Sequence, residues 1–257
     1  MSTFLFSEII FGPVASRRLG VSLGVNLLPT DYKFCTFNCV YCECGWTLKA
    51  QKKITLPSQK QVKEELEKVL KEYNKNGKQI DSITFAGNGE PTIHPDFAAI
   101  IDDTIALRNK WMPKAIISVL SNASQLNKPD ITSALHKIDK NILKLDAGTE
   151  NTYRLINKAQ KHIRFNNIVD YLQNFNGHLI IQTLFIKGEF EGEFFDNTSE
   201  TEITAWLKLI EKIQPQTVML YPIARDTPTD KLTKIDQITL NNIAKRVEAL
   251  GIATEVY

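Results

Sequence analysis

Residues 33–42 read Lys33-Phe-Cys35-Thr-Phe-Asn-Cys39-Val-Tyr-Cys42, and they hold three cysteines in the pattern C-x3-C-x2-C. The only other cysteine of the chain, Cys44, follows directly after this stretch. Four cysteines this close together cannot cross-link a chain of 257 residues, and in a reducing compartment such a cluster indicates metal binding. The cysteine cluster is therefore the feature from which we interpret the rest of the sequence.

Two kinds of metal site are compatible with this spacing. Three thiolates can hold three irons of a 4Fe-4S cluster and leave the fourth iron open to an outside ligand, in which case Cys44 is a free thiol. Alternatively, Cys44 supplies a fourth thiolate to a structural zinc ion, and the protein is then a non-catalytic RNA-binding or interaction protein.

Short apolar runs alternate with helical patterns along the chain, which predicts βα units and a parallel sheet. Helical spacing of apolar residues is clearest in residues 62–73, 97–105 and 203–213. Six such units fit either an open doubly wound sheet or a partial barrel, and both place ligands at the carboxyl ends of the strands. The strand candidates are Val21 to Leu28, Ile80 to Ala86, Ala115 to Leu120, Asn141 to Asp146, His178 to Ile186 and Thr217 to Tyr221.

Composition excludes few classes of function. With 43% hydrophobic residues the chain can bury a full core, and a formal net charge of +2 gives no global attraction to nucleic acid or to an anionic membrane. The sequence has no apolar stretch long enough to span a bilayer and no leader pattern at residue 1, so we expect a cytoplasmic protein without a membrane partner.

Polar residues follow several predicted strands at the edge where ligands bind. Gly87-Asn-Gly-Glu90-Pro91 follows the second strand, where glycines let the backbone approach a ligand closely. Such residues suit hydrogen bonds to a polar ligand, although they also suit turns and helix caps. The later candidates are Ser121-Asn122, Lys144-Leu-Asp146 and Gln182-Thr183.

Together, the cysteine spacing and the Gly87–Pro91 stretch resemble the radical S-adenosylmethionine (SAM) superfamily. The resemblance implies an α/β fold, a partial (β/α)6 TIM-like barrel, with one 4Fe-4S cluster on Cys35, Cys39 and Cys42. It further implies that the open iron binds SAM, which an electron from a donor such as flavodoxin or ferredoxin cleaves to a 5'-deoxyadenosyl radical. That radical would abstract hydrogen from a substrate that the sequence does not identify: a tRNA, a peptide or a small molecule.

The same resemblance assigns expected roles to the cofactor-binding residues. An aromatic residue before the last cysteine would lie beside the adenine, the Gly-rich motif would hold the methionine ammonium, and polar strand ends would bind the ribose hydroxyls and the SAM carboxylate. In this sequence these residues are Tyr41 for the adenine, Gly87, Asn88, Gly89 and Glu90 for the ammonium, and Asn122, Asp146 and Gln182 for the remainder.

Residues 11–29 and the Arg225–Pro228 stretch resemble the branch of iron-sulfur oxidoreductases related to the wyosine tRNA-base synthases. Those enzymes are thought to hold a second cluster on extra N-terminal cysteines, but residues 1–34 contain none here. We therefore expect a single cluster and no wyosine chemistry, although a wyosine-synthase-like tRNA-modifying enzyme stays an alternative.

We expect residues 1–20 to form an N-terminal extension that packs on the barrel, and residues 21–257 to form the core domain. Within the extension, Arg17 and Arg18 would suit a phosphate or carboxylate, or would form a solvated pair or a structural ion pair. Residues 188–196 carry four acidic and three aromatic side chains and are interpreted as a loop, either a lid or a solvated connection.

Overall fold

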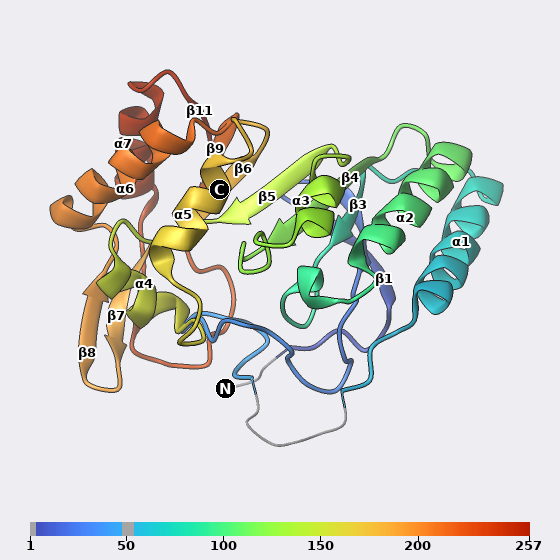
Figure 1. The fold of residues 1–257 in the computed structure, drawn as a ribbon, viewed down its shortest axis with the longest axis horizontal. Coiled ribbons are helices and arrows are strands. Elements are labelled where there is room, and N and C mark those ends of the chain that lie inside the picture. The colour runs from blue at the N-terminus through green and yellow to red at the C-terminus, as the bar shows by residue number, and fades with distance from the viewer. Residues whose placement is uncertain (1–3, 48–53) are drawn as a thin grey trace.

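The computed structural model describes residues 4–47 and 54–257, and an eight-stranded sheet is its central element (Figure 1). Its first strand pairs antiparallel with the second, and all the others pair in parallel. In spatial order the strands are β1 (Ile10–Ser16), β2 (Gly20–Val25), β3 (Ser82–Phe85), β4 (Ile116–Ser121), β5 (Lys140–Lys144), β6 (Ile180–Leu184), β9 (Thr217–Tyr221) and β11 (Ala253–Val256).

Helices connect the parallel strands, with one group along each half of the sheet in Figure 1. Several begin at side-chain caps: Ser58 starts the first helix in a capping box with Gln61, and Ser199 and Asp236 cap two later ones. The helices are α1 (Gln59–Lys75), α2 (Phe97–Trp111), α3 (Pro129–Leu135), α4 (Glu150–Asn157), α5 (Phe165–Gln173), α6 (Glu200–Ile213) and α7 (Gln237–Glu248), with a short 3-10 helix η1 (Pro91–Ile93).

The strand order decides between the two architectures that the sequence allows. From β2 to β11 the parallel strands follow one another in chain order, without the reversal that defines a doubly wound sheet. Right-handed crossovers that always step in the same direction place every connecting helix on the same face of the sheet. The sheet is therefore a partial barrel, as predicted, with its inner face left free of helices.

All six predicted strand runs lie in this sheet, but two of its strands were not predicted. β1 contains Gly12 and Pro13 and has a mostly solvent-accessible burial pattern, so it lacks the apolar run of a central strand. β11 is a four-residue edge strand that follows the sixth unit. Because β1 pairs along β2, residues 10–16 form part of the sheet itself; the proposed division at residue 20 stays a prediction.

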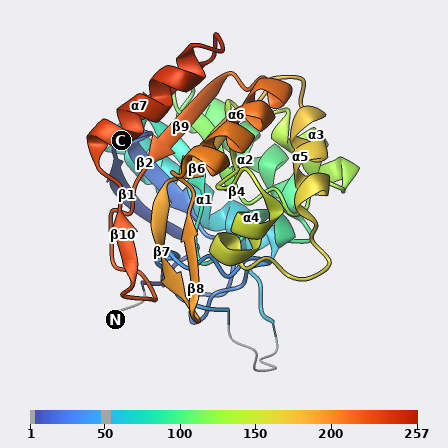
Figure 2. The same cartoon turned by 90° about the vertical axis from the view of Figure 1, so that its left-hand side faces the viewer.

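A second, three-stranded sheet lies near one end of the barrel (Figure 2). Its order is β10 (Leu232–Lys234), β7 (Ile186–Phe190) and β8 (Glu193–Asp196), all antiparallel. The interpretation of residues 188–196 as a loop was wrong, because they form most of a hairpin. Side chains alternate between the two faces of a strand, so the apolar residues here do not form the continuous run of a buried strand. Phe195 is buried, whereas its neighbour Phe194 points outward and is 77% exposed.

The main core lies between the sheet and its helices, and a smaller apolar cluster lies separately from it. The small cluster joins Leu19, from the β1–β2 turn, to Ile142, Ile180 and Met219 of three successive strands. Lys144, Gln182 and Tyr221 each stand two positions after one of these strand residues, so they lie on the same face of the sheet. Within the described residues, no helix is long and apolar enough to cross a membrane.

Candidate functional site

The cysteine loop, residues 26–47, follows β2 and docks against the loop that follows β3. The Phe34 amide donates to the Asn88 carbonyl at 2.8 Å, and the Glu90 amide donates to the Phe34 carbonyl at 3.2 Å. These bonds form a parallel bridge between Phe34 and Gly89. The two sequence motifs that carried the family resemblance are therefore bonded to each other.

Glycine is required for this close approach. A Cβ atom on Gly89 would lie 1.9 Å from the Phe34 carbonyl oxygen, and the residue has a φ of +145°. A Cβ atom on Gly87 would lie 2.3 Å from the side-chain oxygen of Asn26, which itself accepts from the Leu28 and Asn88 amides. The Gly-rich motif thus serves first to bring two backbones together.

The cysteine loop also docks on the carboxyl end of α4. The Val40 amide donates to the Ile156 carbonyl at 2.9 Å, and the Asn38 amide donates to the Asn157 carbonyl at 3.1 Å. The Asn157 side chain then donates to the Cys39 sulfur at 3.5 Å. The loop is therefore held from both sides of the barrel.

Further N–H groups point at the sulfur of Cys35. The Phe37 amide lies 3.4 Å from it and the Asn122 side-chain nitrogen 3.5 Å from it, while the same Asn122 nitrogen donates to the Thr36 hydroxyl at 3.0 Å. Hydrogen bonds to cysteine sulfurs stabilise a negative charge there and tune a bound cluster. Asn122, predicted as a SAM contact, is thus placed as a support of the cysteine loop.

Lys33 supplies a buried positive charge beside the thiols. Its side chain donates to the Gly45 carbonyl at 2.9 Å, and only 2% of the residue is exposed. Burial acts to lower the pKa of Lys33, but the charges of Cys42, Cys35 and Cys39 outweigh it, and the pKa is raised. A cation enclosed with three thiolates offsets part of their mutual repulsion.

The four thiols differ in how readily they ionise. A hydrogen bond from Cys44 and the charge of Lys33 lower the pKa of Cys42 to about 5, although burial opposes them. The bond to Cys42 and burial raise the pKa of the Cys44 thiol, which also lies 3.6 Å from the Gly87 carbonyl oxygen. Burial raises the pKa of Cys35 to about 12 and also raises that of Cys39. Metal coordination at these two thiols therefore displaces protons.

The carboxylate of Glu90 is fully engaged within the protein. It accepts from the Thr92 amide at 3.1 Å, the Thr92 hydroxyl at 2.5 Å, the Ser121 hydroxyl at 2.9 Å and the Asn122 amide at 2.6 Å. Burial raises its pKa, against the effect of these four donors. Glu90 thus ties the end of β3 to the end of β4, and its predicted role toward the methionine ammonium stays a prediction.

The side-chain amide of Asn88 also makes its hydrogen bonds within the protein. Its side chain accepts from the Phe6 amide at 2.8 Å and donates to the carbonyls of Phe6 and Pro29 at 2.9 and 2.8 Å. The residue is fully buried, so its visible function is to hold the N-terminal segment over the loop after β3.

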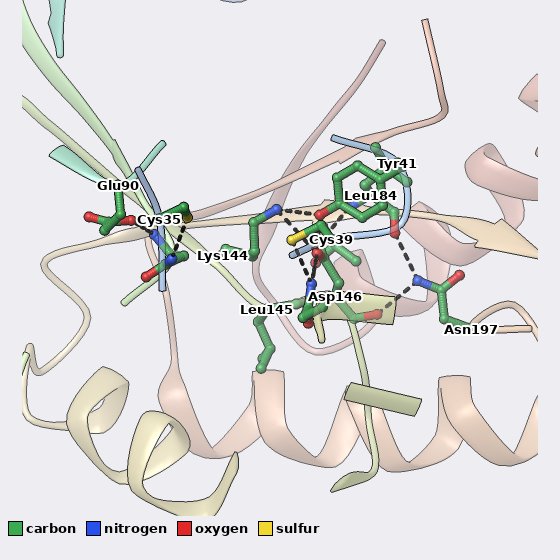
Figure 3. A network of polar contacts seen from close by, with 12 residues as sticks. Cys35, Cys39, Tyr41, Glu90, Lys144, Leu145, Asp146, Leu184 and Asn197 are labelled. Atoms are coloured by element: carbon green, nitrogen blue, oxygen red, sulfur yellow. Dashed lines mark hydrogen bonds and ion pairs between the residues drawn. The ribbon is translucent and has the colours of Figure 1, made fainter. Parts of the chain in front are cut away.

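A buried polar network around Asp146 lies behind the cysteine loop (Figure 3). The carboxylate accepts from the Tyr41 hydroxyl, from the Asn157 side chain at 2.8 Å and from the Leu184 amide at 3.0 Å. Lys144 completes the network as an ion pair at 3.1 Å, with none of the Asp146 side chain exposed. Asp146 therefore joins the ends of β5 and β6 to the cysteine loop.

Tyr41 and Lys144 are coupled through this carboxylate. The Lys144 ammonium donates to the Tyr41 hydroxyl and lies 4.9 Å from the centre of its ring. Burial acts to lower the pKa of Lys144, but Asp146 outweighs it and raises the pKa; burial and Asp146 both raise the pKa of Tyr41. At neutral pH Lys144 is therefore charged and Tyr41 is neutral.

A cavity of about 420 Å³ lies on the inner face of the sheet. Four of the predicted site residues line this cavity: Tyr41, Cys42, Gly87 and Gln182. Gln182 is buried and reaches the cavity from β6. The remaining predicted residues are not among those that line it. They are Cys35, Cys39, Asn88, Gly89, Glu90, Asn122 and Asp146.

Sequence reasoning missed several residues that complete this site. Lys33 stands two positions before Cys35, and a lysine this close to a cysteine motif is a signal that could have been used. Lys144 was named within its strand but given no role. Asn157 and Tyr221 lie far from every motif along the chain, and only the packing of α4 and β9 brings them to the site.

Comparison with known sequences agrees with this architecture. The sequence model described as "Radical SAM superfamily" matches residues 30–197. A protein of Brachyspira hyodysenteriae named "GTPase Obg" is 34% identical over 249 residues, which cover 95% of this chain but 34% of that protein. The chain thus spans about a third of that relative.

Solved structures show the same fold. A radical SAM methyltransferase from Sphaerobacter thermophilus superposes with a TM-score of 0.66 over 92% of this chain and 65% of that one, at 13% identity. Archaeal TYW1 superposes with a TM-score of 0.55 over 89% of this chain and 71% of that one, at 14% identity. At these identities the likeness concerns the fold alone.

The fold is an α/β partial barrel whose carboxyl-terminal loops bring the cysteine motif and the Gly-rich motif together. That architecture, with a family match over residues 30–197, shows that the chain belongs to the radical SAM superfamily. The predicted resemblance is confirmed at this level, and enzyme activity is the general expectation for the class.

Proposed function

We propose that this protein is a radical SAM enzyme that holds a single 4Fe-4S cluster on Cys35, Cys39 and Cys42. The observation that carries the proposal is the position of the cysteine loop: it closes one end of the inner cavity, and Cys42 lines that cavity. A cluster held there would present its open iron to a ligand inside the barrel.

The residues present fit such a cluster by their chemistry. Three thiols come from one loop, N–H donors point at two of the sulfurs, and the buried ammonium of Lys33 lies beside them. Within residues 4–47 and 54–257 no three His, Cys, Asp or Glu side chains, the cysteines included, are gathered closely enough to hold a metal ion, so the fit rests on the chemistry of these donors and not on their geometry. Metal analysis, described below, distinguishes the iron-sulfur proposal from the zinc alternative.

When bound, the cluster and SAM supply reductive cleavage: one electron breaks the sulfonium C–S bond to give methionine and a 5'-deoxyadenosyl radical, which takes a hydrogen atom from the substrate. The residues of this chain would position the bound groups and supply charge beside them. Tyr41 is oriented by Asp146, the Gly87 backbone is exposed to the cavity, and Gln182 offers an amide from the opposite wall. Burial of these groups within the barrel limits the access of water.

The proposed partners follow from that chemistry. The reaction needs a one-electron donor, for which a flavodoxin or ferredoxin is suitable, and the cytoplasm supplies both the donor and the reducing conditions. The second substrate is a tRNA, a peptide or a small molecule, and we propose no membrane partner.

A second candidate function is wyosine-like tRNA modification, which the sequence resemblance of residues 11–29 and 225–228 to the wyosine-synthase branch implies. It conflicts with the cysteine count, because only Cys44 remains after the three proposed ligands and one thiolate does not normally hold a second cubane. Incubation with methylguanosine-bearing tRNA and pyruvate would test it: we expect no tricyclic base in the digested product.

Metal and product analysis test the main proposal. Anaerobically purified protein should contain about four irons with matching acid-labile sulfide, and reduction should convert SAM to methionine and 5'-deoxyadenosine. About one zinc per chain would support the non-catalytic alternative. About eight irons would overturn the single cluster, and S-adenosylhomocysteine or methylthioadenosine as the sole product would reject this cleavage.

A further inference from the structure

The backbone of Arg18 lies at the amino-terminal end of β2, and its side chain extends into the inner cavity as far as the ring of Tyr221, at the carboxyl end of β9. It lies in the turn between β1 and β2, at the start of a six-residue strand whose other end leads into the cysteines. That strand separates the two backbone segments by roughly 20 Å. Arg18 nevertheless lines the same cavity as Tyr41 and Cys42, so its side chain faces the space that SAM and a second substrate would share.

The guanidinium of Arg18 lacks a polar partner within the described part of the chain. Its Nη1 atom is buried and makes no hydrogen bond, and no carboxylate forms an ion pair with it. Its described contact is the ring of Tyr221, whose centre lies 5.0 Å from the guanidinium carbon. Buried N–H groups of arginine are normally paired, because an unpaired one loses its hydration without replacement.

Two other cations at or near the cavity have counter-ions. Lys144 pairs with Asp146 at 3.1 Å, and Arg225 pairs with Glu43 at 2.7 Å. Arg17, the neighbour of Arg18, also lines the cavity but is exposed to solvent, which hydrates its charge. Arg18 is therefore the half-buried cation of this wall that forms no ion pair with the described residues.

We propose that Arg18 anchors a carboxylate or phosphate group of a small-molecule second substrate, an inference that rests on the proposed function. A guanidinium presents two parallel N–H groups that match a carboxylate or a phosphate. The Tyr221 ring holds the guanidinium from one side and leaves its edge available. A small molecule is the favoured class because the anchor lies inside a cavity of about 420 Å³, beyond the cysteine loop.

Anion binding by the purified full-length chain tests the anchor without any need for cluster or turnover. Inorganic phosphate, followed by phosphorus NMR line broadening, and acetate, followed by saturation transfer, serve as probes for the two anion types. Arg18→Gln should weaken binding of the preferred probe by about 10-fold or more, as expected for loss of a charge-assisted pair. Arg18→Lys should restore part of it, and Arg17→Gln, in the same turn, should bind like the unmodified chain.

Two results would overturn the proposal: no binding of either probe, or equal binding by Arg18→Gln and the unmodified chain. A third arm adds SAM to cluster-containing protein. If the anion stays bound, the site belongs to a second substrate; if SAM displaces it, Arg18 serves the SAM carboxylate and the proposal is wrong. Failure to assemble a cluster would count against the proposed function and would leave the anion result readable.

Discussion

The cysteine end of the barrel and the turn between β1 and β2 differ in how their polar groups are satisfied. At the cysteine end, Glu90 accepts four hydrogen bonds, and Asp146 is bonded to three neutral donors and a lysine. In the turn, Arg18 has a buried nitrogen without a partner among the described residues. The first group of residues holds its own shape, whereas Arg18 is able to bind a ligand.

This difference separates residues that support a site from residues that contact a ligand. A buried carboxylate that already accepts several hydrogen bonds has little capacity left for a ligand, whereas an unpaired buried cation gains from one. Glu90 and Asp146 were both predicted as SAM contacts, yet the structure gives them positioning contacts. The following predictions test the comparison, from the largest expected effect to the smallest.

The largest effect is expected at the three proposed ligands. Cys35→Ala, Cys39→Ala and Cys42→Ala should each abolish cluster assembly, because two thiolates hold a cubane poorly. Iron and sulfide content after anaerobic reconstitution measures this. Cys44→Ala is the matched control and should retain its iron; equal loss of iron in that variant would show that the ligand assignment is wrong.

Asp146→Asn should destabilise the cysteine end by about 3–5 kcal/mol, because it leaves Lys144 buried without its counter-ion. Urea unfolding measures the change in the free energy of unfolding. Glu200→Gln removes a surface carboxylate that pairs with Arg246 at 2.8 Å and should cost less than about 1 kcal/mol. Similar losses in the two variants would mean that the Asp146 network does not hold the cysteine end together.

Gly89→Ala should destabilise the protein by about 2–4 kcal/mol through backbone strain and a clash with the Phe34 carbonyl. Gly192→Ala is a control with φ of +83° and no atom within 4 Å of the added Cβ, so it carries strain without a clash. Thermal unfolding and iron content measure both. We expect Gly89→Ala to lose iron and Gly192→Ala to keep it; indistinguishable variants would rule out the contact between the two motifs as a requirement.

The smallest effect is expected at the outer rim of the cavity. Arg225 and Glu43 form an ion pair with side chains 59% and 39% exposed, so Arg225→Gln should change the free energy of unfolding by less than about 1 kcal/mol. Urea unfolding at low and high salt measures this. A loss well above that value would show that the rim is held as firmly as the network around Asp146.

The fold could be predicted largely because its signals are local. Six apolar strand runs and the helical spacing between them predicted the βα units, and the family resemblance carried by the cysteine loop implied the partial barrel that the strand order then showed. The edge strand β1 and the β7–β8 hairpin escaped prediction, because half-exposed antiparallel strands such as Glu193–Asp196 carry short, mixed patterns. β1 and β8 each pair with the strand next to them in the chain, and β7 pairs in addition with the distant strand β10.

The sequence by itself determined the cysteine spacing, the glycines that follow β3 and the order of the βα units, because each of these features depends on residues that are close together in the chain. Only the tertiary structure decided which polar side chains face the cavity and which make their hydrogen bonds within the protein. The carboxylate of Asp146 is not free to bind a ligand, because it accepts hydrogen bonds from Tyr41, Asn157 and Leu184. Arg18 has an unpaired nitrogen, because no acceptor among the described residues lies beside it. Those neighbours are brought together only by long-range packing, so no local pattern reports them.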